Sequence, residues 1–531
     1  MQLEPEKHVE MEMPNYPIGK QSFADIRQNG YLYIDKTAFI PLLLKNGSFK
    51  FLSRPRRFGK SLLISTLEAY FTNKRDLFKG LAIDRMQPEP WQEYTVLHFD
   101  FSGHNYNQAK ILNHSLKSKL SEYEHSLGIN PDEDDDISLR FHRIVRTSYE
   151  RTGRGVVILI DEYDNPITSA IDNPELQDEL RKILYGFYSS FKSLDQYIHF
   201  CILTGVTKYG KMSVFSGLNN LKDISFLDKF AGICGITEAE LLENLNPGVE
   251  ELAKKLNVTT NEAYNRLKVH YDGYHFSEGL IDIYNPFSII NALSDSKILN
   301  YWAATGTPTM LIKLLKAHDF DISKLNGAEA SLDELGNIYG PQINPKALFY
   351  QTGYLTIKSY DPEYQSYFLS FPNLEVERTF MDNLLEIYTE ENTNPIAKEI
   401  PRALRRGDVK SVIALLKSFL SGIPFDLRKR VAKYENYYHT ILYAIFSLIG
   451  TEVAAEYHTA RGSIDMIIRT NDYIYILELK VNGTAEEAIA QIREKGYAEP
   501  FATDPRKTIL IGLGFSKDSN TITSDKVEPE I

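Results

Sequence analysis

The sequence contains few cysteines and no long apolar run. Only two cysteines, Cys201 and Cys234, occur in 531 residues, too few for a disulfide framework or a thiolate zinc site. The acidic segment Met1–Met13 has no apolar stretch of the kind that a secretory signal needs. Apolar runs such as Val156–Ile160 are far shorter than the ~20 residues that span a bilayer. We therefore expect a cytoplasmic protein in a reducing compartment, with no membrane partner.

Internal repeats and low-complexity blocks are also missing, which excludes a solenoid. Positive charge is not in excess either: the formal net charge is -12, whereas a nucleic-acid coat protein is usually basic. An enzyme that meets nucleic acid only at a local site stays compatible with this charge, because local patches set the field. The 43% hydrophobic and 12% aromatic residues exclude disorder over most of the chain and predict a globular protein of several domains.

Three regions with different patterns follow one another along the chain. In the first, short apolar runs alternate with helical stretches, as in a parallel sheet of an α/β domain; the expected strands are Phe49–Ser53, Thr95–Phe101, Val156–Asp161 and His199–Gly205. Helical periodicity dominates the second region, with a few strands expected near Phe349–Ile357. The third region has the pattern of a compact α/β domain. The predicted domains are 1–240, 241–420 and 421–531.

A nucleotide site is predicted near the start, where Arg54–Ser61 joins a strand to an apolar helix. Backbone N–H groups of such a loop and helix N-terminus hold phosphate oxygens; the binding residues expected are Arg57, Phe58, Gly59, Lys60 and Ser61. Lys60 would reach the outer phosphates, and the Ser61 hydroxyl would ligate Mg²⁺. The loop departs from the usual motif at Arg54, which replaces the first glycine. We expect Arg54, Arg56 and Arg57 to add positive charge suited to a polyanion.

Support for nucleotide binding comes from the apolar run that ends in Asp161 and Glu162. A fully apolar run suits a central parallel strand covered on both faces. Asp161 at its end would hold Mg²⁺, and Glu162 would activate the water that attacks the γ-phosphate. Thr204, at the end of a third strand, would sense that phosphate. The alternatives are a buried strand that ends in solvated acids, and a site that binds ATP without hydrolysing it.

A second, hydrolytic site is predicted in the third region. Two strands joined by Asn471-Asp472 form a hairpin, and in that register Asp465 lies directly opposite Glu478. Opposed carboxylates repel unless a cation lies between them. The period of two places Lys480 on the same face as Glu478. This arrangement predicts Mg²⁺ held by Asp465 and Glu478, with Lys480 orienting water or stabilising negative charge. The alternative is a solvent-exposed face of salt bridges.

Two further features accompany this site. The following helix begins with a capping box at Thr484 and carries Gln491. Upstream, the basic stretch Arg428–Arg430 with Lys433 would meet a phosphate backbone. For that stretch, a solvated helix face is the alternative.

In this order, the motifs resemble the bacterial AAA-ATPase-like family whose members carry a PD-(D/E)XK nuclease-superfamily domain at the C-terminus. The resemblance covers nearly the whole chain and rests on Tyr31–Thr37, Arg54–Ser61, Ile160–Asp164, Leu203–Lys208, Gly217–Asn220, Tyr271–Tyr274, Tyr284–Pro286, Gln351–Leu355, Asp465 and Glu478–Lys480. The family's own loop also has arginine at the position of Arg54. The nuclease pattern falls on Asp465, Glu478 and Lys480. The Gln-and-Tyr helix of some superfamily members resembles Gln491 and Tyr497.

The resemblance implies an α/β fold class with three parts: a P-loop NTPase domain with a parallel sheet, a mostly helical middle region and a restriction-endonuclease-like α/β domain. It also implies ATP and Mg²⁺ as cofactors. We expect an ATP-binding, ATP-hydrolysing protein coupled to a nuclease that cleaves nucleic acid, with DNA as the favoured partner. Modules of this kind often assemble, so a homo-oligomer is also expected. Two alternatives stay open: a nucleotide-switched binding protein, and a remodelling ATPase whose nuclease-like domain only binds a partner.

Overall fold

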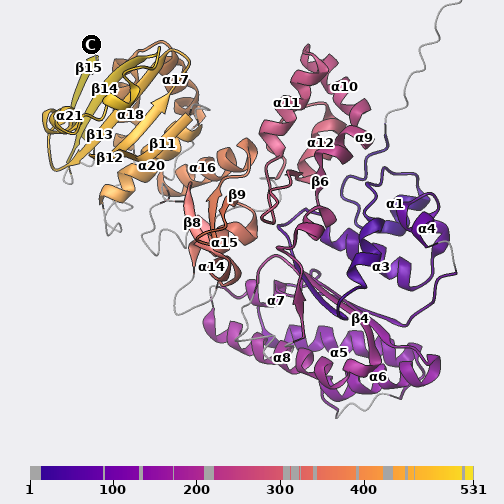
Figure 1. Cartoon of the computed structure of the whole chain (residues 1–531). Coiled ribbons are helices and arrows are strands. Elements are labelled where there is room, and N and C mark those ends of the chain that lie inside the picture. Colours follow the sequence, from indigo (N-terminus) through magenta and orange to yellow (C-terminus); the bar gives the residue numbers. More distant parts are fainter. Residues whose placement is uncertain are drawn as a thin grey trace, which may run out of the picture. The chain divides into compact units, whose positions relative to one another are not determined.

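The chain divides into two compact units (Figure 1). Unit 1 comprises Met1–Trp302 and Glu329–Asn373, and unit 2 comprises Ala303–Ala328 and Leu374–Ile531. The computed structural model describes residues 14–87, 90–130, 135–171, 173–208, 220–302, 311–312, 322, 325–338, 344–389, 394–422, 434–448, 452–459, 461–516 and 521–529.

A five-stranded, wholly parallel sheet in the order β2-β3-β4-β1-β5 forms the first part of unit 1. Its strands are β1 (Phe49–Ser53), β2 (Val96–Asp100), β3 (Val156–Asp161), β4 (Ile198–Gly205) and β5 (Lys222–Asp223). The apolar run of β3 is buried at every residue, as expected for a strand covered on both faces. The carboxyl ends of β1, β3 and β4 therefore lie side by side at one edge, where ligands bind in such sheets.

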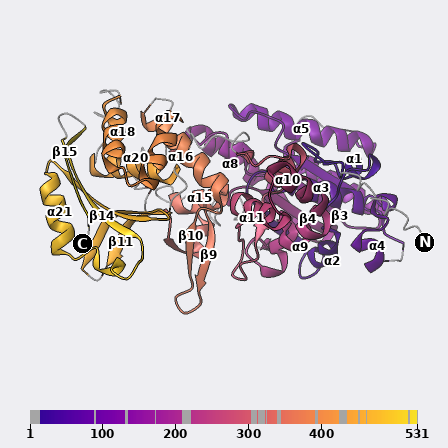
Figure 2. The same ribbon diagram turned by 90° about the horizontal axis from the view of Figure 1, so that it is seen from above.

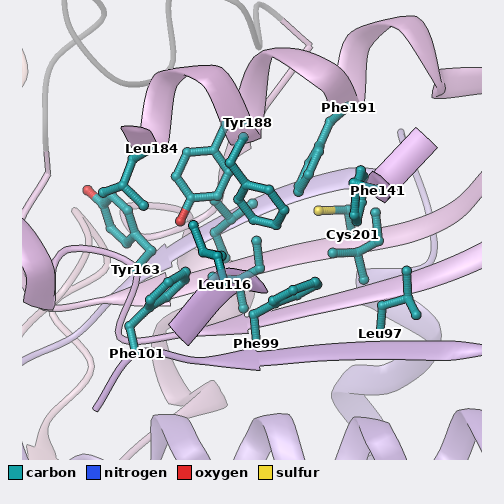
Figure 3. Close-up of a cluster of buried hydrophobic side chains, with 14 of the residues drawn as sticks. Leu97, Phe99, Phe101, Leu116, Phe141, Tyr163, Leu184, Tyr188, Phe191 and Cys201 are labelled. Atoms are coloured by element: carbon teal, nitrogen blue, oxygen red, sulfur yellow. The ribbon is translucent and has the colours of Figure 1, made fainter. Parts of the chain in front are cut away.

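Helices cover both faces of this sheet (Figure 1). One face carries α3 (Lys60–Phe71). The other carries α5 (Ala109–Ser126), α6 (Ile137–Thr152) and α8 (Pro174–Ser193), which share a large aromatic core with the strands (Figure 3). Shorter helices are α1 (Phe23–Gln28), α2 (Ile40–Leu43), α4 (Ala82–Met86) and α7 (Asn165–Thr168).

The second part of unit 1 begins with a helical group that has its own apolar core, to which Tyr16 from the start of the chain contributes. This group consists of α9 (Glu238–Asn244), α10 (Asn246–Leu256), α11 (Thr260–Tyr271) and α12 (Pro286–Asp295), with the short strands β6 (Ile236–Thr237) and β7 (Ile283–Tyr284). A three-stranded sheet, β8-β10-β9, follows. Its elements are β8 (Ala328–Ser331), α14 (Leu332–Gly336), α15 (Pro345–Thr352), β9 (Thr356–Asp361) and β10 (Ser366–Ser370).

Unit 2 is built on a mixed five-stranded sheet in the order β11-β12-β13-β14-β15. The strands are β11 (Glu452–Thr459), β12 (Gly462–Arg469), β13 (Tyr473–Val481), β14 (Lys507–Phe515) and β15 (Ile522–Pro529). Figure 2 shows α21 on one side of the sheet and a group of helices on the other. The helices are α16 (Leu374–Thr389), α17 (Asn394–Arg405), α18 (Val409–Gly422), α20 (Tyr434–Leu448) and α21 (Ala485–Glu494).

The strands predicted from apolar runs are confirmed, with ends shifted by one residue at most in β1 to β4. The strand prediction near Phe349–Ile357 is wrong in its first half, because Phe349–Thr352 belongs to α15. A run of large apolar residues buried on all sides has the same composition in either element. Among the described residues, no helix is long and apolar enough to cross a membrane. The boundaries of the three predicted domains stay a prediction.

Candidate nucleotide and nuclease sites

The predicted phosphate loop lies between β1 and α3, at the carboxyl edge of the parallel sheet. Two of its residues, Arg57 and Gly59, have positive φ values of 68° and 93°, so the loop turns sharply before the helix begins. Among the described residues, no side chain caps the N-terminus of α3. The first-turn N–H groups of a helix have no partner within the helix. They are therefore available to an anion, and phosphate binding by this loop stays a prediction.

Lys60 lies inside the loop rather than at its surface. Its side chain is 3% exposed, and its Nζ donates to the carbonyl oxygens of Arg54 and Pro55 at 3.1 and 3.2 Å. The same Nζ lies 3.6 Å from Oε1 of Glu162. The ammonium group is thus held within the turn of the loop, beside the carboxylate that follows β3.

Asp161, Ser61 and Thr204 meet at the ends of β3, α3 and β4. Thr204 Oγ1 donates to Asp161 Oδ1 at 2.6 Å, and the Ser61 side chain also hydrogen-bonds to this carboxylate. Burial raises the pKa of Asp161, and the hydrogen bonds from Ser61 and Thr204 oppose this rise. A hydroxyl and a carboxylate in contact are the ligand types that Mg²⁺ takes. The residues predicted for this metal therefore fit it.

Glu162 has a backbone conformation that is rare for its residue type. Its φ is 53°, in the left-handed region that costs free energy for a residue with a side chain. Its N–H donates to Asp161 Oδ1 at 3.1 Å, and its side chain is 24% exposed. In this conformation the partly solvated carboxylate lies beside the loop, next to Lys60.

The prediction for Arg54 is wrong. Its guanidinium is buried and donates to the carbonyl oxygens of Ser53, Ser225 and Phe230 at 2.9 to 3.0 Å. It also lies over the ring of Phe276 at 4.1 Å. The charge of Arg54 is therefore used inside the protein, where it ties the loop to the chain after β5. Arg56 and Arg57 remain exposed.

A second carboxylate, Asp164, was not assigned a role from the sequence. It is 2% exposed and accepts hydrogen bonds from the N–H and the hydroxyl of Thr207, both at 2.6 Å. Tyr163 donates from its hydroxyl to the Thr207 carbonyl at 2.6 Å. These bonds fasten the segment after β4 to the segment after β3. The signals in the sequence were its position, three residues after Asp161, and its place at the end of the motif Ile160–Asp164.

The C-terminal hairpin has the predicted register. Met466 pairs with Leu477 and Arg469 with Ile474, and the N–H of Thr470 donates to the Tyr473 carbonyl at 2.8 Å. Asp465 lies one residue beyond the pair Met466–Leu477, opposite Glu478. Its Oδ2 accepts a hydrogen bond from the N–H of Leu479 at 2.7 Å. Backbone and side chain together thus fix Asp465 beside β13.

Glu478, Lys480 and Gln491 form one connected group. Lys480 Nζ donates to Glu478 Oε1 at 3.1 Å and to Gln491 Oε1 at 2.6 Å. Gln491 in turn donates from Nε2 to Glu478 Oε1. Burial and, next to it, the charge of Asp465 raise the pKa of Glu478 to about 7, against the opposing effect of Lys480. Glu478 is 1% exposed, so the alternative of a solvent-exposed face does not describe it.

The second oxygen of Glu478 provides a test of metal fit. Oε2 is buried and has no hydrogen-bond partner among the described residues. A buried carboxylate oxygen without a partner is costly, unless it ligates a cation. Two carboxylates, Asp465 and Glu478, face one another here, and oxygen donors are what Mg²⁺ prefers. The described residues contain no group of three or more His, Cys, Asp or Glu side chains suited to a metal ion.

Other residues predicted near this site are placed elsewhere or lie outside the described part. Tyr497 is 2% exposed and packs in the apolar core under α21, against Gly462, so it is a core residue. Two upstream acids of the sequence, Glu435 and Glu456, could each add a carboxylate or be no more than an exposed acid; their side chains lie outside the described residues. The basic stretch Arg428–Arg430 with Lys433, and the motif residues Gly217–Asn219, also lie outside them.

Comparison with known proteins gives two family matches and one relative over the full length. Residues 17–215 match the family described as predicted AAA-ATPase, and residues 433–525 match the PD-(D/E)XK nuclease superfamily. An uncharacterized protein in the vnfD 5′ region of Azotobacter chroococcum mcd 1 is 34% identical over 532 residues, which are 98% of this chain and 99% of that protein.

Among solved structures, Cdc6p from Pyrobaculum aerophilum matches at 11% identity with a TM-score of 0.24, over 71% of this chain and 97% of that chain. A likeness this weak carries no argument. The two family matches, in contrast, fall on the parallel sheet of unit 1 and on the mixed sheet of unit 2. The chain therefore belongs to the AAA-ATPase-like family whose members carry a PD-(D/E)XK nuclease-superfamily domain at the C-terminus.

Proposed function

We propose that this chain binds and hydrolyses ATP in unit 1 and cleaves nucleic-acid phosphodiester bonds in unit 2, with DNA as the substrate and Mg²⁺ as the metal. The observation that carries the proposal is the buried Glu478. Its Oε2 has no partner among the described residues, and it lies opposite Asp465 and beside Lys480. A decayed module would gain stability by losing this arrangement.

At the nucleotide site, each residue has a separate task. Lys60 places positive charge among the phosphates, and Ser61 and Asp161 would hold Mg²⁺. Glu162 accepts the proton of the attacking water from its place 3.6 Å from Lys60. Thr204 keeps the Asp161 carboxylate oriented through their 2.6 Å hydrogen bond. In this proposal, ATP binding or hydrolysis in unit 1 controls phosphodiester cleavage in unit 2.

At the nuclease site, Asp465 and Glu478 would hold Mg²⁺. A bound divalent cation polarises the phosphodiester and lowers the pKa of a water ligand. Lys480 places its ammonium next to the reacting phosphate, where it stabilises the added negative charge. Gln491 orients Lys480 through the 2.6 Å bond from Nζ to Oε1. The N–H of Leu479 fixes the direction of the Asp465 carboxylate.

Cleavage of labelled DNA and RNA by the purified chain tests the nuclease, in Mg²⁺ or Mn²⁺ and with or without ATP. We expect metal-dependent cutting of DNA that Asp465→Ala and Lys480→Ala abolish. Asp472→Ala is the matched control, because Asp472 is an exposed acid in the turn of the same hairpin. Equal cutting by Asp465→Ala and the wild type would refute the site.

ATP binding and hydrolysis are tested separately. We expect Lys60→Ala and Asp161→Asn to weaken ATP binding, Glu162→Gln to retain binding and lose hydrolysis, and Lys74→Ala to behave as the wild type, since Lys74 is exposed after α3. All four variants leave the nuclease-site residues of unit 2 unchanged. ATP binding with no cleavage under any condition would instead favour the nucleotide-switched binding protein or the remodelling ATPase.

A further inference from the structure

The nucleotide loop is enclosed by residues that lie far along the chain in unit 1. The Phe58 ring is 1% exposed and packs edge-on against Tyr274 and Phe276, with ring centroids 4.8 and 5.3 Å apart. The Phe58 carbonyl accepts a hydrogen bond from the N–H of Gly235 at 3.0 Å. The residue immediately before Gly59 and Lys60 is therefore anchored on the second part of unit 1 by its side chain and its backbone.

The first part of the loop has similar contacts. Gly353, the residue after α15, touches Pro55: a Cβ built on Gly353 would lie 2.7 Å from the Pro55 Cβ. Trp302 donates from Nε1 to the Arg56 carbonyl at 3.4 Å and packs against Tyr354, with ring centroids 4.9 Å apart. Pro55, Arg56 and Phe58 thus each meet a different partner from residues 274–354.

The same end of α15 also holds the segment after β4. Gln351 Oε1 accepts a hydrogen bond from the N–H of Lys208 at 2.6 Å, and its Nε2 donates to the Leu335 carbonyl at 2.6 Å. The buried Gln351 therefore joins the strand end that carries Thr204 to α14. Gln351 and Gly353, which are two residues apart, thus contact the segment after β4 and the phosphate loop, respectively.

The segment that carries Tyr274 is itself firmly held. His275 donates its N–H to Thr356 Oγ1 at 2.7 Å, and its Nδ1 lies 2.6 Å from the Ile357 carbonyl oxygen. Asn373 donates from Nδ2 to the Asp272 carbonyl at 2.8 Å. These bonds attach residues 272–276 to β9 and to the end of unit 1. Movement of Phe58 consequently requires movement of a hydrogen-bonded group, not of one free ring.

We propose that Tyr274, Trp302, Gln351 and Gly353 form a loop brace that positions the phosphate loop for ATP. None of them belongs to the loop or to the strand ends that carry Asp161 and Thr204, so they act as positioning residues. The inference rests on the proposed ATP binding. Because coupling between sites is reciprocal, bound ATP also stabilises the packing of the loop brace. Segments 271–274 and 351–355 of the family motif thereby acquire a role in nucleotide use.

The first test adds one methyl group between the loop and its brace. Gly353→Ala places a Cβ within 2.7 and 2.9 Å of Pro55 side-chain atoms, so either the loop or the brace must shift. Gly80→Ala is the matched control: its φ of +80° is close to the +91° of Gly353, but no atom lies within 4 Å of its Cβ. Both variants place a side chain at a positive φ of similar size. We expect the Kd for ATP to rise about tenfold in Gly353→Ala only, which corresponds to about 1.4 kcal/mol.

A rescue separates positioning from a general loss of folding. Pro55→Gly removes the atoms that the new methyl group meets. We expect Gly353→Ala to cost about tenfold in ATP affinity in the wild-type loop, and less than about twofold in the Pro55→Gly background. An equal cost in both backgrounds would overturn the proposal, because a merely structural defect does not depend on Pro55.

A nucleotide-free measurement distinguishes this inference from the proposed function. The chain has two tryptophans, so Trp91→Phe leaves Trp302 as a fluorescent reporter beside Arg56. In that background we expect Gly353→Ala to shift the Trp302 emission without ATP, and Gly80→Ala to leave it unchanged. If the wild type fails to bind ATP, the proposed function fails, while the emission shift still supports the brace. If Gly353→Ala shifts neither the emission nor the Kd, the brace is refuted.

Discussion

The buried carboxylate of Glu478 should make the stability of unit 2 depend on pH. Burial raises its pKa from the ordinary 4.5 to about 7. The folded form therefore binds a proton more tightly than the unfolded chain does, and stability falls as pH rises through this interval. A factor of ten in an equilibrium constant is about 1.4 kcal/mol, so ionisation of Glu478 costs the folded state about 3 kcal/mol by pH 8. Below about pH 4.5 the cost is absent.

Glu478→Gln removes this titration while keeping the shape of the side chain. The free energy of opening of β13 can be followed by hydrogen exchange of peptides that cover Tyr473–Val481, corrected for the intrinsic pH dependence of amide exchange. Relative to the wild type, we expect the free energy of opening of β13 in the variant to increase progressively between about pH 4.5 and pH 7. Above pH 7 the difference between the two proteins should be constant. That difference is about 3 kcal/mol, or a protection ratio on the order of a hundred.

Magnesium should cancel the effect in the wild type. A cation between Asp465 and Glu478 favours both charged forms, so millimolar Mg²⁺ should stabilise β13 at pH 8 and have little effect at pH 5. Glu478→Gln should respond weakly at both. Parallel pH profiles for the wild type and Glu478→Gln would refute the reasoning, because they would mean that water or another group already solvates the carboxylate.

Two further predictions concern unit 1. Gly205→Ala should destabilise the parallel-sheet part by about 1–3 kcal/mol, because its Cβ would lie 2.5 Å from Asp164 Oδ1 and 2.6 Å from the Tyr163 ring; Gly186→Ala, in α8 with no atom within 4 Å, should stabilise by about 0.5–1 kcal/mol, and equal melting shifts would contradict the contact. Glu124→Ala should cost about 3–5 kcal/mol, because Glu124 is fully buried and pairs with Arg140 at 2.9 Å. Denaturant titration measures this cost, and the pair Glu124→Met with Arg140→Leu should restore most of it.

Local sequence patterns were sufficient to predict most of the strands of the parallel sheet and the register of the C-terminal hairpin. The apolar run of Val156–Asp161 and the turn at Asn471-Asp472 each depend on neighbours within a few residues, so the sequence states them directly. The proximity of Asp465 and Glu478 could be predicted from the sequence because a two-residue turn fixes the pairing of both strands. The short strand β5 and the polar edge strand β15 lack such patterns and were not predicted.

The burial of polar side chains and their contacts with distant segments could not be predicted from local patterns. The Arg54 side chain donates hydrogen bonds to the carbonyl oxygens of Ser225 and Phe230. These partners are distant in the sequence, so no pattern near Arg54 predicts them. The burial of Glu478 arises from the packing of α21 against β13, which brings Gln491 into contact. The roles assigned to the ATP-site and nuclease-site residues stay predictions.

The position of β1 in its sheet has a consequence for synthesis of the protein. β1 pairs on one side with β4 and on the other with β5, so Phe49 has no sheet neighbour until Cys201 has been made. The loop around Lys60 is therefore synthesised long before β4, the first strand that can pair with β1. Contacts between distant segments form late because the intervening chain must first be ordered. A ribosome-bound fragment that ends before β4 should leave the ribosome tunnel without ATP affinity, which the chain acquires only after β4, β5 and the segment around Gly353 have emerged.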